Sequence, residues 1–290
     1  MNGRELFGLI KAAAIGWSQD RASSMGAAIA FYTVLSLAPL LLIVISVAGL
    51  FFGEEAARGA LIDQLTELVG ENGGAAIQAA LSSAHDPGRG LISVLIGVAT
   101  LMIGATTVFM ELQANLDRIW KVPMIGGVTG YVRRRMLSFG VILGVGFLLT
   151  VSLVMTAVIT AIGTFWQDRI GGWQAPIQLL NFAVSFGIVT LLFGMIYKLL
   201  PSVNNAWGDV WTGAAVTSLL FSIGKYLIGL YIGSAAVSSS YGAAGAFVVL
   251  IVWVYYSAQI FLFGAEFTYR YACLRGSLRH DPIHAGNASR

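Results

Sequence analysis

The sequence predicts an all-α, polytopic integral membrane protein with about six transmembrane helices, and composition, run length and charge distribution support this prediction. Hydrophobic residues make up 57% of the chain and charged residues only 11%, whereas soluble domains hold about 25% charged residues. Several apolar runs reach the roughly 20 residues that a helix needs to cross the hydrocarbon core of a bilayer. The lysines and arginines are distributed very unevenly among the segments that join these runs.

The apolar runs follow one another along the chain, each bounded by charged or polar residues. The tract after Asp209 is too long for one span, and the small-residue segment GSAAVSSSYGAAG divides it into two. We therefore predict one membrane domain, residues 1–275, and a disordered cytoplasmic tail, residues 276–290. The predicted spans lie near residues 28–52, 91–111, 137–162, 177–199, 207–231 and 243–267.

The residues before the first span do not form a cleavable signal, because charged side chains interrupt them and no small-residue cleavage site follows an apolar run. Leu6, Ile10, Ala13, Ala14 and Trp17 recur at helical spacing. This pattern predicts a short helix that lies in the plane of the membrane interface.

The basic residues predict the orientation of the chain. Lysine and arginine accumulate in the cytoplasmic loops of membrane proteins. With six spans, 13 basic residues fall on one side and only Arg58, Arg89 and Arg169 on the other. Both termini are therefore predicted to lie in the cytoplasm of a bacterial inner membrane. The 13 are Arg4, Lys11, Arg21, Arg118, Lys121, Arg133, Arg134, Arg135, Lys198, Arg270, Arg275, Arg279 and Arg290.

The segment 53–90, between the first two spans, is predicted to be an external amphipathic helical hairpin. Leu61 and Leu65 share one helical face, Ile77 and Leu81 share another, and an Asn-Gly-Gly step separates the two stretches. Its charge is mainly acidic. The hairpin is a candidate surface for an envelope protein partner.

Four strings together resemble the YihY/BrkB family of bacterial inner-membrane proteins. They are AAIAFYTVLSLAPLLL, ELQANLDRIW, LLPSVNNAW and YGAAGAFVVLIVWVYYSAQIFLFGAEFTY, and the likeness covers about Ala22 to Tyr271. The resemblance implies a six-span helical membrane fold. Members of the family have carried a virulence label and an older label of tRNA-processing ribonuclease, and some have been linked to transport of lipids or other envelope amphiphiles.

The residues argue against an enzyme. A metal-dependent nuclease needs several converging ligands, but His85 lies in the external segment and His280 and His284 in the tail, and no HExxH or CxxC pattern occurs. The Gly224-Lys225 step lacks the earlier glycine of a phosphate-binding loop. We therefore predict no metal, no cofactor, no ATPase and no nucleic-acid partner.

Polar residues within or at the ends of the spans are the candidates for an ion or substrate site. Gln259 in a span must face a partner or a wet groove. For Glu266 the favoured interpretation is an ion pair with Arg270 one turn later, and for Lys225 it is snorkelling to the outer interface; a functional site is the alternative for both. The candidate site residues are Glu111, Asp117, Lys225, Gln259 and Glu266.

Two further sets of residues carry predictions. Arg133, Arg134 and Arg135 anchor the topology and are candidates for contact with anionic lipid headgroups. Pro39, Gly242 and Gly245 are candidate helix breaks, although a simple kink is the alternative at Pro39.

The favoured function is a transport-type inner-membrane protein that moves a lipid or another envelope amphiphile without its own ATPase. The alternative is a non-transport scaffold or envelope assembly factor, and the ribonuclease is the least favoured. Membrane lipids are the predicted partners, and the oligomeric state does not follow from the sequence.

Overall fold

Helices and short connections make up the whole of the described part of the chain, in which no strand occurs. A computed structural model describes residues 3–69, 71–84, 107–122, 174–203, 205–234 and 245–278. The all-α prediction agrees with this structure. The labelled helices are α1 (Gly3–Gln19), α2 (Ala22–Phe52), α3 (Glu54–Val69), α4 (Glu71–Ala84), α7 (Gln174–Leu199), α8 (Trp207–Ser234) and α10 (Gly245–Leu274), and residues 107–119 are also helical.

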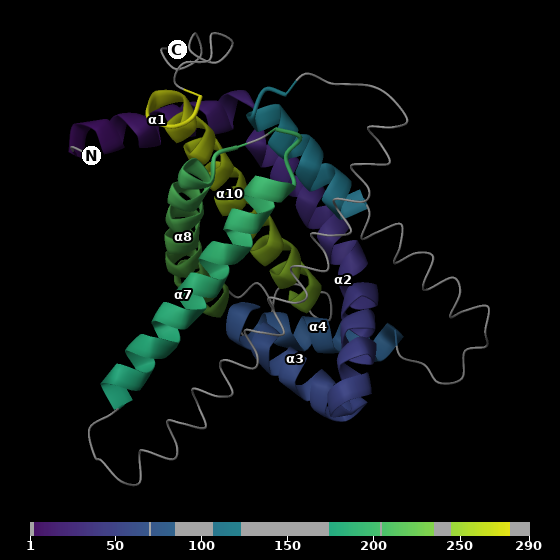
Figure 1. Cartoon of the computed structure of the whole chain (residues 1–290). Helices are drawn as coiled ribbons and strands as arrows, with labels where there is room; N and C mark the ends of the chain where they lie inside the picture. Colours follow the sequence, from purple (N-terminus) through teal and green to yellow (C-terminus); the bar gives the residue numbers. More distant parts are fainter. Residues whose placement is uncertain are drawn as a thin grey trace.

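Helix α10 is the centre of the bundle (Figure 1). It packs against α8, α2, α1 and α4, while α7 packs against α8. The short helix α1 lies across one end of the bundle, and the pair α3 and α4 lies at the opposite end (Figure 1). The chain therefore places its amino-terminal helix and the carboxyl end of α10 side by side.

Four long helices occupy four of the predicted spans: α2, α7, α8 and α10 coincide with the first, fourth, fifth and sixth. Within the described residues, the segments Phe182–Leu199 and Val248–Leu274 are long and apolar enough to cross a membrane. Most of the predicted second span and all of the third fall outside the described residues. The count of six and the orientation stay predictions.

One face of α8 carries large apolar side chains that no described part of the chain covers. Leu219, Ile223, Leu227 and Leu230 recur every three or four residues and are each more than half exposed. In water, a contiguous apolar face of this kind is unusual for a monomer. It is the pattern expected of a helix that faces lipid on one side and protein on the other.

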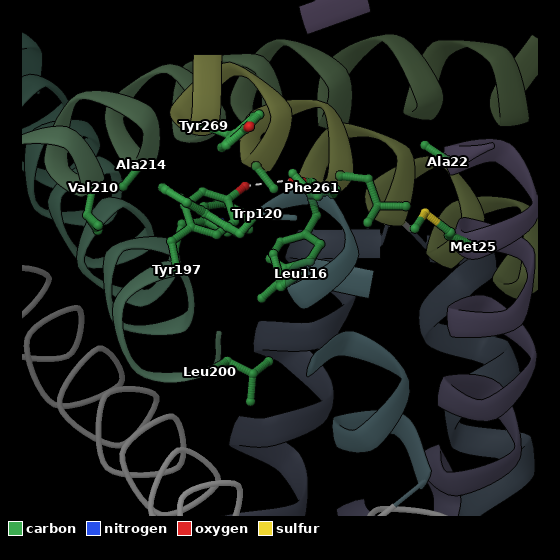
Figure 2. Close-up of a cluster of buried hydrophobic side chains, with 14 of the residues drawn as sticks. Ala22, Met25, Leu116, Trp120, Tyr197, Leu200, Val210, Ala214, Phe261 and Tyr269 are labelled. Atoms are coloured by element: carbon green, nitrogen blue, oxygen red, sulfur yellow. Dashed lines mark hydrogen bonds between the residues drawn. The ribbon is translucent and has the colours of Figure 1, made fainter. Parts of the chain in front are cut away.

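The main hydrophobic core joins α10 to α2, α7, α8 and the helical residues 107–119. Trp120 packs edge-on against Tyr269, with ring centroids 5.6 Å apart. Tyr197 of α7 reaches between α8 and α10, where its hydroxyl donates a hydrogen bond to the backbone carbonyl of Phe261 at 2.7 Å (Figure 2). These aromatic side chains fill the space where four helices converge.

Helices α8 and α10 approach each other closely through two reciprocal pairs of glycine and threonine. A Cβ atom on Gly213 would overlap the side chain of Thr268, and one on Gly264 would overlap that of Thr217. Each threonine hydroxyl donates to a carbonyl of its own helix, Thr217 to Gly213 at 2.8 Å and Thr268 to Gly264 at 2.7 Å. The polar groups are therefore satisfied without separating the helices, as small-residue packing in membranes requires.

The ends of α2 depend on residues with left-handed or glycine backbone. Arg21, at φ 56°, precedes its first turn, and Gly53, at φ 84°, ends its last turn. The helix continues through Pro39. Gly245 is the first residue of α10, and Gly242 lies outside the described residues, so a helix break at these two glycines stays a prediction.

Helices α3 and α4 occupy the segment 53–90, where the sequence predicts a helical pair, and they pack against each other. Ile77 and Leu81 are buried against α2 and α10, together with Leu41 and Val254. The apolar face of α4 thus closes one end of the bundle. That this end lies outside the cell stays a prediction.

Candidate functional site

A line of polar side chains runs along one face of α10 where this helix meets α1 and the beginning of α2. Gln259 and Glu266 are seven residues apart, which is close to two helical turns, and Arg270 follows one turn later. All three face glycines or charged residues of the α1–α2 corner. We call this set the polar seam, and it consists of Gly16, Asp20, Lys121, Gln259, Glu266 and Arg270.

Two glycines provide the room for the polar seam. A Cβ atom on Gly16 of α1 would overlap Oε2 of Glu266 and would lie 3.2 Å from Nη2 of Arg270. A Cβ atom on Gly26 of α2 would overlap Nε2 of Gln259. The long polar side chains of α10 therefore lie directly on the bare backbone of the two neighbouring helices.

Asp20 lies in the turn between α1 and α2 and brings a carboxylate to the polar seam. Nζ of Lys121 donates to both of its carboxylate oxygens, at 2.7 and 2.6 Å. The side chain of Asp20 is only 11% exposed, and that of Lys121 is 37% exposed. The pair therefore extends from the protein interior to its surface.

Glu266 occupies the centre of the polar seam and is 1% exposed. Its carboxyl group lies close to that of Asp20, and the charges of Lys121 and Arg270 act on it. Its Oε1 is buried and accepts no hydrogen bond from any described residue. A buried carboxyl oxygen without a donor is costly, so this atom marks a place where an exchangeable group is needed.

The polar seam holds two carboxyl groups and two basic side chains, Asp20, Glu266, Lys121 and Arg270, three of which are less than 10% exposed. Removing charges from water costs several kcal/mol per ion, and their mutual attraction offsets this cost only with good geometry. Apolar residues would stabilise the same junction at least as well. Ionisable groups kept at such a position in a membrane helix indicate a functional site.

The backbone is strained on both sides of Asp20. Arg21 and Lys121 are the non-glycine residues with positive φ in the described segments, at 56° and 54°. Lys121 occupies the position after the helix 107–119 where glycine is usual, because Val122 N–H binds the carbonyl of Asp117 and Lys121 N–H binds that of Arg118. Such strain costs about 1–3 kcal/mol and is concentrated at functional sites.

The structure brings two of the predicted site residues together, Glu266 and Gln259. Gln259 donates from Nε2 to the carbonyl of Ala22 at 3.4 Å, and its Oε1 has no partner among the described residues. It therefore faces α2, in agreement with the requirement that a glutamine in a span meet another helix. Arg270, the predicted neighbour of Glu266, lies in the same seam.

The other acidic candidates are not in the polar seam. Asp117 accepts hydrogen bonds from the backbone N–H and the hydroxyl of Ser202, at 2.6 and 2.9 Å, and so attaches the end of α7 to the helix 107–119. Glu111 accepts a hydrogen bond from Asn115 at 3.4 Å. Both residues serve local structure in this arrangement.

Lys225 is half-buried on α8 and lies 16 residues, or about 24 Å, along that helix from Asp209. Because Asp209 binds Ser277 just beyond α10, Lys225 is near the opposite end of the bundle from the polar seam. Arg133, Arg134 and Arg135 lie outside the described residues.

Sequence reasoning did not identify Gly16, Asp20 and Lys121 as site residues. Asp20 is 101 residues from Lys121 along the chain, and no periodic pattern joins them. One local signal was available: Asp20 and Arg21 are adjacent opposite charges between two apolar segments. Among the described residues, no group of three His, Cys, Asp or Glu side chains is placed to bind a metal ion.

Comparison with known proteins gives consistent results over most of the chain. The family model described as "Virulence factor BrkB" matches residues 14–285. A UPF0761 membrane protein of Pseudoalteromonas translucida is 28% identical over 251 residues, which cover 85% of this chain and 79% of that protein. A UPF0761 membrane protein of Vibrio parahaemolyticus is 29% identical over 263 residues, with 87% and 78% covered.

A UPF0761 membrane protein of Pseudomonas aeruginosa is 25% identical over 250 residues, which cover 85% of this chain and 58% of that protein. The names of these relatives describe membrane proteins and mention no reaction. No solved structure is significantly similar to this chain.

Proposed function

Since the chain belongs to the BrkB family of membrane proteins, we propose that it is a transport-type protein of the bacterial inner membrane that moves a lipid or another envelope amphiphile without an ATPase of its own. The observation that carries this proposal is the polar seam. Its ionisable groups lie between helices that pack largely through apolar side chains, and a polar headgroup needs such groups to pass apolar helices.

Lys121 is the residue of the polar seam that can bind a lipid headgroup. Its ammonium group binds Asp20, yet its side chain is 37% exposed. Arg21 is exposed beside it. An anionic headgroup that reaches this end of the bundle can take over the hydrogen bonds of Lys121, because phosphate and carboxylate oxygens are equivalent acceptors for an ammonium group. The headgroup of the substrate would then replace the carboxylate of Asp20 as the partner of Lys121, and the polar seam would open.

Reconstitution tests the proposal. Purified protein in vesicles that contain neutral and anionic lipids should exchange labelled lipid between leaflets faster than protein-free vesicles. Glu266→Gln and Lys121→Met should slow exchange at least about tenfold, which corresponds to about 1.4 kcal/mol in the barrier. Glu5→Gln is the matched control, because Glu5 forms an exposed ion pair with Arg275 at 2.7 Å outside the seam.

Rates equal to those of protein-free vesicles for every lipid would refute transport of a lipid. Exchange rates equal to that of the wild-type protein in both Glu266→Gln and Lys121→Met would show that the polar seam takes no part in transport. In either case the structure would need another explanation for buried ionisable groups.

A second candidate function is a scaffold for envelope assembly, which the pair α3 and α4 favours. Glu54, Glu55 and Asp63 are exposed on α3, and an acidic helical surface can bind a basic partner through charge complementarity. Site-specific crosslinking from exposed positions of α3 in cells tests this function. A stoichiometric protein partner supports it, and crosslinks to lipid alone would contradict it.

A further inference from the structure

Two carboxyl groups meet at the centre of the polar seam. Asp20 is 8% exposed and Glu266 is 1% exposed, and the two carboxyl groups are close enough to act on each other. An ionised carboxylate can only accept hydrogen bonds. Two neighbouring buried carboxyl groups therefore avoid mutual repulsion when one of them holds a proton.

The second oxygen of Glu266 points to the same requirement independently. Its Oε1 is buried and has no hydrogen-bond donor among the described residues. On the other side, Oε2 lies so close to the backbone of Gly16 that a Cβ there would overlap it. An ionised carboxylate in this position would leave a charged oxygen buried and unsatisfied, whereas a protonated one carries no net charge into the interior.

The surrounding charges decide which carboxyl group holds the proton. From the segment after the helix 107–119, Lys121 donates to both oxygens of Asp20, at 2.7 and 2.6 Å, so these oxygens already have a cationic donor, which Oε1 of Glu266 lacks. From α10 itself, Arg270 lies near Glu266, with Nη2 beside the same glycine. Arg21 at the start of α2 is exposed to the surface. The bidentate contact to Asp20 therefore assigns the proton to Glu266.

We propose that Glu266 and Asp20 form a proton-binding site, in which Glu266 carries the proton and Asp20 accepts its hydrogen bond. We also infer that this proton is the coupling ion of the transport described above, and only this coupling rests on the proposed function. A transporter without an ATPase needs another source of energy, and a coupled proton supplies it.

The position of α1 gives the proton a route to water. Gly16 and Asp20 belong to α1 and to the turn that follows it, so a displacement of this end of α1 from α10 would uncover Glu266. Lys121 already joins the seam to the surface. When the seam opens, Glu266 releases its proton to water and becomes a carboxylate, and when the seam closes it takes the proton up again. No other bond forms or breaks.

Infrared difference spectroscopy on the full-length protein in lipid nanodiscs tests the site. Spectra recorded between about pH 5 and about pH 9 report the carbonyl band of carboxyl groups that gain a proton. We expect a band from a buried, protonated carboxyl group in the wild-type protein. It should be absent in Glu266→Gln, which has the same shape as protonated glutamate, and retained in Glu5→Gln.

Asp20→Asn provides the second variant, since it keeps Glu266 but replaces the group that accepts its hydrogen bond. The band should then persist at a shifted frequency. A wild-type protein without such a band, or a band that neither Glu266→Gln nor Asp20→Asn alters, would overturn the proton site.

The coupling is tested in vesicles with an imposed proton gradient and labelled anionic lipid. A wild-type exchange rate that depends on the gradient, with this dependence lost in Glu266→Gln, supports proton coupling. An exchange rate indifferent to the gradient would overturn the coupling. Failure of the proposed function has a different signature, because lipid exchange would then be absent while the infrared band of Glu266 was still present.

Discussion

The contact of Gly16 with Glu266 allows a sharp test with a single methyl group, the substitution Gly16→Ala. At an open position of a helix, alanine in place of glycine stabilises the folded state by about 0.5–1 kcal/mol. At Gly16 the new Cβ would overlap Oε2 of Glu266 and lie 3.0 Å from its Cδ. An isolated glutamate would turn aside at little cost, but here Asp20 and Arg270 hold the carboxyl group in place.

The magnitude follows from these constraints. Adding atoms to a well-packed interior costs about 1–3 kcal/mol, so Gly16→Ala should destabilise the protein although alanine favours a helix. Gly8→Ala on the same helix is the matched control, because nothing lies within 4 Å of a Cβ at that position. The control should be stabilised by about 0.5–1 kcal/mol. The two variants should therefore differ by roughly 2 kcal/mol or more.

Denaturant unfolding of the purified protein in detergent micelles measures this difference. A double-mutant cycle of Gly16→Ala with Glu266→Ala identifies its source, because removing the carboxyl group removes the clash and the two changes should not be additive. If Gly16→Ala were as stable as Gly8→Ala, or if the cycle showed no coupling, then α1 would not lie against Glu266 and the seam would lose its basis.

Two further substitutions test the remaining contacts of the bundle. Lys121→Met leaves the carboxylate of Asp20 largely buried without its cation, which should lower the free energy of unfolding by about 1–3 kcal/mol. The cost is smaller than the 3–5 kcal/mol of a fully buried pair because Lys121 is 37% exposed. Denaturant unfolding measures this loss of stability. Gly264→Ala should cost about 1–3 kcal/mol because its Cβ would overlap Thr217, and adding Thr217→Ala should restore part of the loss in the same assay.

Each of these has a control in the chain. Arg275→Met removes an exposed ion pair whose side chains are 48% and 47% exposed, and it should change stability by less than about 1 kcal/mol. If Arg275→Met lost as much stability as Lys121→Met, burial would not be the reason that the ion pair of Asp20 contributes to stability. Gly187→Ala is the control for Gly264→Ala, since a Cβ there meets nothing within 4 Å.

The long helices could be predicted because lipid imposes a simple requirement on the sequence. A spanning helix must satisfy all its backbone groups internally and present apolar side chains over its whole length. The run that becomes α2 meets this requirement in the sequence alone, and the run that becomes α10 meets it apart from Gln259 and the charged residues near its carboxyl end. The ends of the long helices depend on neighbouring residues, because Gly53 ends α2 and Pro201 follows α7.

The docking of α1 could be predicted only in part. The apolar spacing indicates an amphipathic helix, and Leu6 and Ile10 are indeed exposed on α1. However, the buried face of α1 is formed by Leu9, Ala13 and Gly16, and it shares only Ala13 with the predicted apolar face. A helix with apolar residues on two faces does not reveal which face meets protein and which meets lipid, because both environments accept the same side chains.

The polar seam could not be predicted because its partners are not neighbours in the sequence. Glu266 was a candidate on the general ground that charge in a span is costly. The carboxyl group that acts on it, that of Asp20, lies 246 positions earlier, outside any predicted span. Propensity and periodicity act over one or two helical turns and carry no information about such a pairing.

The carboxyl-terminal part of α10 is attached to α8 and to α1 by different forces, and this difference decides which contact can open. Against α8, the reciprocal contacts of Thr217 and Thr268 with glycine backbone depend on shape, and no bound ion or headgroup can replace them. Beside α1, small apolar contacts of Leu9 and Ala13 are combined with the ion pairs Asp20–Lys121 and Glu5–Arg275. The exposed pair contributes little to stability, and Lys121 is itself partly exposed, so water or an anionic headgroup can take the place of its partner. The structure therefore favours movement of α1 over a fixed pair α8 and α10, so the proton site is uncovered without breaking the core.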